Sequence, residues 1–145
     1  IDIWHFGMSA LFESDKSVEQ LATEIADELT AHQPTGAGVR DATEALALNC
    51  LQTRSFSPSC FWDLMLASGL DFTGLYSAYV GKNVLNFFRQ DHGYKEGTYV
   101  KNWAGREDNE HLVELVAALD KSADNFADRV YQALEVRYRE LVHQG

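Results

Sequence analysis

The sequence has few prolines, few cysteines and no long apolar run. Two prolines in 145 residues, together with few alternating β-branched stretches, argue against a sheet. The two cysteines, Cys50 and Cys60, form no CxxC motif, so we expect free thiols in a reducing compartment rather than a disulfide or a metal pair. No apolar segment approaches the roughly 20 residues that span a bilayer, so we expect no membrane contact.

Positive charge is also scarce, and it is unevenly distributed. The chain has 12 Lys and Arg against 22 Asp and Glu, a net charge of −10, which argues against a broad nucleic-acid or anionic membrane surface. The window 82–106 nevertheless contains five basic residues and only two acidic ones. The basic residues are Lys82, Arg89, Lys95, Lys101 and Arg106. This local inversion of charge indicates a site for a small anion.

Helical periodicity dominates the chain and predicts an all-α fold of six or seven helices in a single domain, 1–145. Ser17 and Gln20 form a capping-box pattern that opens one helix, and Pro58 suits the first turn of another. Asp108 can cap a helix that runs to Leu119. The first predicted helix, about 2–13, is apolar nearly all round, as is typical of a buried central helix. The other predicted helices cover 39–54, 58–69, 72–91, 108–119 and 123–143.

The first residues of the sequence lack the features of a natural N-terminus. The sequence opens at Ile1 without an initiator Met, in what the pattern predicts to be the middle of a helix. We therefore expect 1–145 to be the C-terminal part of a longer protein, truncated at its N-terminus.

Lys82, Asn86 and Arg89 are spaced four and three residues apart, so they share one face of the helix predicted over 72–91. The loop that follows adds further cations and phenols, and its glycines let the backbone approach a ligand. Two interpretations stay open: a polyphosphate site or a solvated basic face. Because Lys95, Lys101 and Arg106 repel one another, we expect the loop 93–106 to be weakly held without an anion. Trp103 is predicted to anchor it.

The segment 81–109, GKNVLNFFRQDHGYKEGTYVKNWAGREDN, resembles the C-terminal motif block of the dimeric deoxyuridine triphosphatases (dUTPases). These enzymes belong to the all-α nucleoside triphosphate pyrophosphohydrolase superfamily, which includes MazG-like proteins. The opening IDIWHF is similar to the end of the ExxD metal-binding helix of that family, with Asp2 as its aspartate.

The resemblance implies Mg²⁺-dependent hydrolysis of dUTP, and of dUDP, by a cytoplasmic homodimer that releases dUMP from dUTP. It implies four Mg²⁺ carboxylates, of which this chain has Asp2; a water-activating Glu is expected upstream, so no catalytic base is assigned here. It places Lys82, Arg89 and Lys101 on the phosphate chain, and Asn86, Tyr94 and Asn109 on phosphate or deoxyribose. It places His5 and Phe6 at the sugar and base end of the pocket.

Two alternatives stay open. A pyrophosphatase of the same fold could act on dCTP or another non-standard nucleotide, because the base-reading segment of the family lies upstream. A helical nucleotide- or partner-binding module without activity would also have this pattern. Glu107 and Asp108 are interpreted as ordinary first-turn acids and not as metal ligands. The apolar residues of the last helix are interpreted as core or dimer interface: Phe126, Val130, Tyr131, Leu134, Tyr138 and Leu141.

Overall fold

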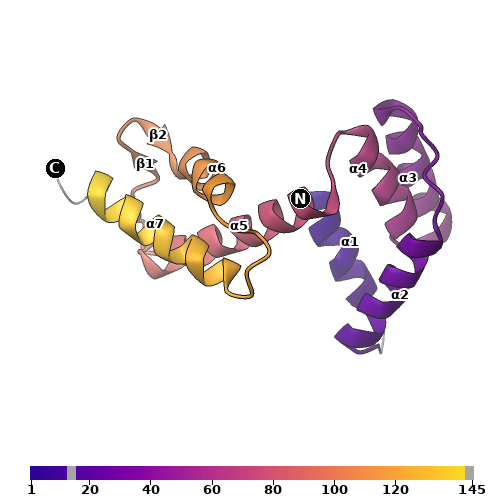
Figure 1. Cartoon of the computed structure of the whole chain (residues 1–145), viewed down its shortest axis with the longest axis horizontal. Helices are drawn as coiled ribbons and strands as arrows, with labels where there is room; N and C mark the ends of the chain where they lie inside the picture. Colours follow the sequence, from indigo (N-terminus) through magenta and orange to yellow (C-terminus); the bar gives the residue numbers. More distant parts are fainter. Residues whose placement is uncertain (13–15, 143–145) are drawn as a thin grey trace. The chain divides into compact units, whose positions relative to one another are not determined.

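The computed structural model describes residues 1–12 and 16–142, and within them it contains seven α-helices and one two-stranded hairpin. The all-α fold that the sequence predicts is confirmed. The chain forms two compact units, Ile1–Asp71 and Phe72–Gly145. In Figure 1 the first unit runs from indigo to magenta and the second from magenta to yellow. No helix of the described part is both long and apolar enough to cross a membrane.

The N-terminal unit contains four helices: α1 (Asp2–Phe12), α2 (Val18–Ala31), α3 (Val39–Thr53) and α4 (Pro58–Ala67). The predicted capping box at the start of α2 is confirmed, because the Ser17 hydroxyl accepts the Gln20 backbone N–H and the Gln20 side chain accepts the Ser17 N–H. Pro58 occupies the first turn of α4 as predicted, after the N-cap Ser57. Local sequence thus sets where these helices begin.

Helix α1 packs through one narrow face. Gly7 is its buried residue, and a Cβ there would lie 2.5 Å from a ring carbon of Phe56. The Trp4 ring meets the rings of Phe56 and Phe61 at centroid distances of 6.2 and 5.5 Å. The prediction of a buried helix is wrong, because Gly7 is the buried residue of α1, while Met8 and Leu11 are half-buried and several large apolar side chains are exposed. The most exposed are Ile3, Phe6 and Phe12.

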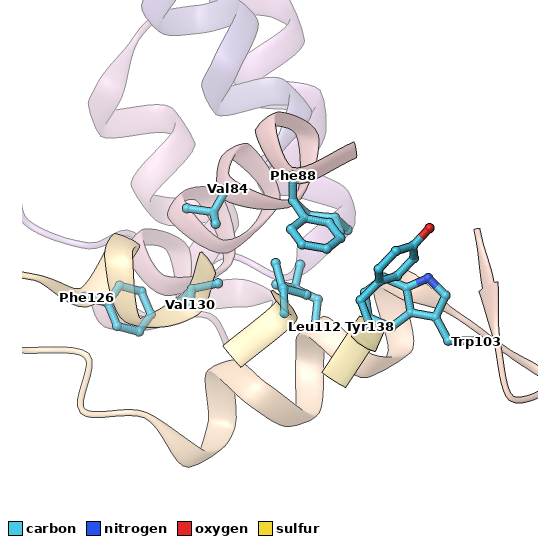
Figure 2. Packing of buried hydrophobic residues seen from close by; sticks show 9 residues of the cluster. Val84, Phe88, Trp103, Leu112, Phe126, Val130 and Tyr138 are labelled. Atoms are coloured by element: carbon cyan, nitrogen blue, oxygen red, sulfur yellow. The ribbon is translucent and has the colours of Figure 1, made fainter. Parts of the chain in front are cut away.

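The C-terminal unit contains α5 (Phe72–Asp91), β1 (Asn102–Trp103), β2 (Arg106–Glu107), α6 (Asp108–Ala118) and α7 (Phe126–Val142). Figure 2 shows its core, in which the indole of Trp103 lies beside Tyr138 of α7 and meets the ring of Phe88 of α5. Phe88 of α5 is fully buried, and so are Val130 and Leu134 of α7. The prediction that the last helix contributes core residues is confirmed for Phe126, Val130, Leu134 and Tyr138.

The segments around α6 and α7 differ from prediction. Helix α6 is capped by Glu107, whose side chain forms a capping box with Glu110, so the prediction that Asp108 is the cap is wrong. Helix α7 begins at Phe126 rather than at residue 123, because 121–125 form turns; the predicted last residue, His143, lies outside the described residues. A short hairpin also pairs β1 with β2, although the composition of the chain argues against a sheet.

The backbone conformation of the hairpin turn is set by its two central residues. Ala104 and Gly105 both have positive φ, 48° and 85°, which is the conformation of the two central residues in a type I′ turn. Such a turn pairs Asn102 with Glu107 and Trp103 with Arg106. It therefore turns the Trp103 side chain into the core while the chain reverses and enters α6.

Candidate active site

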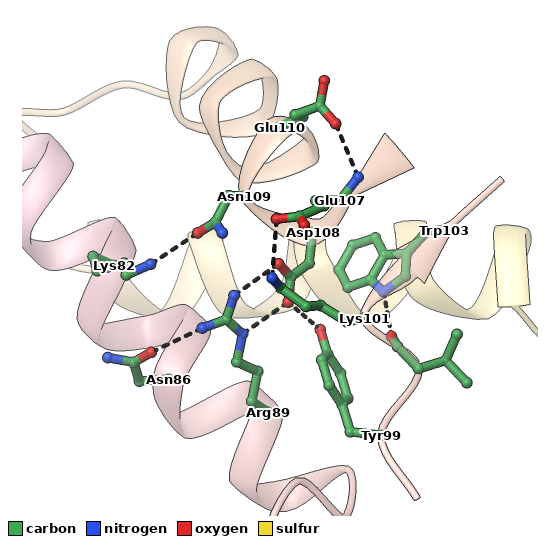
Figure 3. Close-up of polar contacts among 11 residues, drawn as sticks. Lys82, Asn86, Arg89, Tyr99, Lys101, Trp103, Glu107, Asp108, Asn109 and Glu110 are labelled. Atoms are coloured by element: carbon green, nitrogen blue, oxygen red, sulfur yellow. Dashed lines mark hydrogen bonds and ion pairs between the residues drawn. The ribbon is translucent and has the colours of Figure 1, made fainter. Parts of the chain in front are cut away.

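The polar face of α5 is formed as the spacing predicts. Lys82 Nζ donates to Asn109 Oδ1 at 2.9 Å, and Arg89 Nη1 donates to Asn86 Oδ1 at 3.4 Å (Figure 3). Four of the residues predicted to bind nucleotide, three on α5 and one in the first turn of α6, are thus gathered in one cluster. The amide partner of Lys82 is uncharged, so this contact leaves the charge of the ammonium uncompensated.

Asp108 is the centre of the cluster, and the sequence did not predict this role. Arg89 Nε donates to Asp108 Oδ2 and Arg89 Nη2 to Oδ1, both at 2.7 Å. The Tyr99 hydroxyl donates to Oδ2 at 2.8 Å. The Asp108 side chain is 0% exposed and that of Arg89 is 12% exposed. A buried, bidentate ion pair of this kind fixes both side chains.

The protonation states of these three groups depend on one another. Burial alone would raise the pKa of Asp108, but the hydrogen bonds from Arg89 and Tyr99 outweigh it and hold that pKa below its usual value. The hydrogen bond to Asp108 raises the pKa of Arg89 against the opposing effect of burial. Burial, followed by the bond to Asp108, raises the pKa of Tyr99. The cluster is therefore a carboxylate held by a guanidinium and a neutral phenol.

This arrangement predicts a pH dependence of stability. Because the folded-state pKa of Asp108 is depressed below its unfolded value of about 3.9, the pair stabilises the fold above about pH 4. That contribution is lost as the pH falls through the depressed pKa. We expect the free energy of unfolding, measured by urea denaturation between about pH 2 and 6, to decline with acid. The slope should be shallower in Asp108→Asn, and an unchanged slope in this variant would contradict the contribution of Asp108.

The hairpin places the start of α6 against α5. Lys101 Nζ lies 3.0 Å from Glu107 Oε2, and the Lys101 carbonyl accepts the Asp108 backbone N–H at 3.0 Å. The Trp103 indole N–H donates to the Val100 carbonyl at 2.8 Å. These contacts fix the chain before Asn109, which can then meet the Lys82 ammonium.

The prediction of a weakly held loop is wrong for its second half. Trp103 is 0% exposed, so its predicted role as an anchor is confirmed. The expected repulsion is offset, because Lys101 pairs with Glu107 and Arg106 Nη2 lies 2.7 Å from Glu114 Oε1. The acids that offset the repulsion come from the end of the hairpin and from α6, and not from the loop's own cationic stretch.

Tyr94 lies in the turn after α5. Its backbone N–H donates to the Arg89 carbonyl at 2.9 Å, and its side chain is 56% exposed. The turn needs glycine at position 93, where φ is +85° and a Cβ would lie 2.0 Å from Thr98 Oγ1. The exposed phenol is thus attached, through the backbone, to the residue that carries the buried guanidinium.

Asp2 and His5 belong to the other unit, in the first half of α1. Both residues are exposed, and the His5 ring lies 5.6 Å from the ring of Phe6. Within the described ranges 1–12 and 16–142, no group of three or more His, Cys, Asp or Glu side chains could hold a metal ion. Asp2 can contribute carboxylate oxygens of the kind that Mg²⁺ prefers, but the described residues do not complete a magnesium site.

Comparison with known families agrees with the helical fold. The model of the dUTPase family matches residues 1–94, the larger part of the chain. This match defines the class of the protein as a hydrolase of the nucleotide pyrophosphatase kind. The chain belongs to the dUTPase family. The matched range includes α1 to α5 and ends at Tyr94, so Lys101, Asp108 and Asn109 lie beyond it. Among curated proteins, none matches the chain.

Proposed function

We propose that the protein hydrolyses dUTP to dUMP and pyrophosphate and that the reaction depends on Mg²⁺. The observation that carries the proposal is the match to the dUTPase family over residues 1–94. The cluster on α5 supports it, because it concentrates cationic and amide donors in a chain whose net charge is −10. A triphosphate is an anion that such donors suit.

The residues of the cluster have distinct tasks in this proposal. The Lys82 ammonium attracts and neutralises phosphate charge, since its partner Asn109 is neutral. Arg89 contributes directional hydrogen bonds, because Asp108 already compensates its charge. Asn86 and Asn109 donate amide N–H groups to phosphate or sugar oxygens. Positioning and charge neutralisation of this kind are the main protein contributions to phosphoryl transfer.

The magnesium requirement is a part of the proposal that rests on the family resemblance and on Asp2. Bound Mg²⁺ would neutralise phosphate charge and orient the triphosphate for attack by water. The chain's own cations are arranged for the same anion, and Lys101 lies at the edge of the cluster with its ammonium 3.0 Å from Glu107. An incoming phosphate competes with Glu107 for that exposed ammonium.

Turnover of a nucleotide panel tests the proposal. We expect release of pyrophosphate from dUTP, with dUMP as the second product, to require Mg²⁺ and to exceed release from dCTP, dTTP and UTP. Preference for dCTP would assign a different base to the same fold. Nucleotide binding without turnover in the presence of Mg²⁺ would identify a binding module and contradict the proposed reaction.

A further inference from the structure

The guanidinium of Arg89 has two usable edges, and Asp108 occupies one of them. Five N–H groups are available on an arginine side chain. Asp108 accepts from Nε and from one hydrogen of Nη2. The second hydrogen of Nη2 and both hydrogens of Nη1 take no part in this contact. The Nη1–Nη2 edge has the paired geometry that binds a phosphate in a bidentate manner.

The remaining edge faces the predicted nucleotide-binding residues. Nη1 points to Asn86 Oδ1 at 3.4 Å, a long contact that an incoming oxygen could replace (Figure 3). Asn86 lies one turn before Arg89 on α5, and Lys82 lies one turn before Asn86. Because the three share a helix face, the open edge of the guanidinium and the Lys82 ammonium belong to the same polar surface.

Asp108 itself is rigidly placed. Its carboxylate is 0% exposed and accepts the Tyr99 hydroxyl at 2.8 Å. Its backbone N–H donates to the Lys101 carbonyl at 3.0 Å. A side chain held by the hairpin, by a neighbouring phenol and by the first turn of α6 gives Arg89 a fixed partner. The guanidinium is therefore oriented before any ligand arrives, which reduces the rotamer freedom lost on binding.

We propose that Asp108 is a positioning residue for substrate. It holds the Arg89 guanidinium through Nε and Nη2, so that the Nη1–Nη2 edge binds a phosphate group of the nucleoside triphosphate. This inference rests on the proposed function and adds to it a residue beyond the range that the dUTPase model matches. It also explains why an acid is buried in a site that binds an anion. Asp108 compensates the positive charge of Arg89, so the electrostatic attraction for phosphate comes from Lys82.

Lysine cannot replace arginine in such an arrangement. An ammonium at position 89 would be captured by Asp108 and would have no second, fixed edge for phosphate. Arg89→Lys keeps the charge and an ion pair, so the fold should be retained while phosphate binding is lost. This variant separates positioning from charge, and it remains informative even if Asp108→Asn does not fold.

The test combines turnover with the affinity for pyrophosphate, at constant free Mg²⁺. We expect Asp108→Asn and Arg89→Lys each to lower kcat/KM for dUTP by at least about tenfold and to raise the inhibition constant of pyrophosphate by a similar factor. The double variant should lose little more than the worse single variant, because both changes disable one unit. A merely structural role would reduce the active fraction and leave the inhibition constant unchanged.

Asp91→Asn is the matched control. Asp91 also lies on α5 and accepts a tyrosine hydroxyl, that of Tyr131, at 2.8 Å, and no arginine is bonded to it in the described structure. This variant should retain wild-type turnover and inhibition. Wild-type affinity for pyrophosphate in Arg89→Lys, or in a folded Asp108→Asn, would overturn the inference while leaving dUTP hydrolysis intact. If the wild-type protein hydrolyses no nucleotide, the proposed function fails, and calorimetric pyrophosphate binding to the same variants still decides the role of Asp108.

Discussion

Replacing Arg89 by Ala is expected to lower kcat/KM for dUTP by more than tenfold and the free energy of unfolding by about 3–5 kcal/mol. The kinetic loss follows from removal of a phosphate donor. The loss of stability follows because the Asp108 carboxylate, which is 0% exposed, would be left without its cation. The burial of Asp108 therefore adds a loss of stability to the kinetic loss.

Arg139→Ala is the control for this prediction. Arg139 lies on α7, its side chain is 70% exposed, and its contact with Glu135 is 3.4 Å long. Exposed pairs of this kind contribute at most about 1 kcal/mol, so turnover and stability should stay close to wild type. Steady-state kinetics and urea denaturation measure both effects. Wild-type kinetics in Arg89→Ala would remove Arg89 from the site, and wild-type stability would contradict the buried pair.

Replacing Trp103 by Ala is expected to cost about 3–5 kcal/mol of stability in the C-terminal unit, as is usual for deleting a buried indole. Trp103 is fully buried, its ring lies 5.2 Å from that of His111 in a stacked arrangement, and it meets the Tyr138 ring edge-on at 5.2 Å. Loss of the indole also releases the hairpin from the core. Amide hydrogen exchange in β1, β2 and the first turn of α6 should therefore accelerate.

Trp103→Phe gives the comparison. Phenylalanine keeps part of the ring contacts but cannot donate to the Val100 carbonyl, so we expect a smaller loss than in the Ala variant. The order of stability should be wild type, then Phe, then Ala. A loss of less than about 1 kcal/mol in Trp103→Ala would show that the indole is not the anchor of the hairpin.

Local sequence predicts much of this fold. The helical spacing of its apolar residues and the glycine at position 93 predict the bounds of α5, and the structure confirms them as Phe72–Asp91. The capping box at Ser17 was equally clear. The shared face of Lys82, Asn86 and Arg89 follows from their spacing alone. Each of these features depends on residues within one or two helical turns.

The sequence predicts neither the role of Asp108 nor the hairpin turn, for different reasons. Asp108 looks like an ordinary first-turn acid, and only the approach of Arg89, 19 positions away, makes it a buried partner. The turn at Ala104 and Gly105 lacks the Asn-Gly or Asp-Gly pair that commonly marks a type I′ hairpin. Arg89 directly follows the apolar pair Phe87 and Phe88, and this placement is the signal in the sequence that favours a search for an acidic partner.

A nuclear magnetic resonance titration with a non-hydrolysable dUTP analogue and Mg²⁺ tests the role of the α5 polar face directly. We expect saturable shifts of the Arg89 Nε–H, the Lys82 ammonium and the Tyr94 amide, with Arg89 still bonded to Asp108 at saturation. Such a result would place the phosphate chain on the polar face of α5. Saturable binding of the analogue that leaves the Arg89, Lys82 and Tyr94 signals unchanged would show that the phosphate chain binds elsewhere.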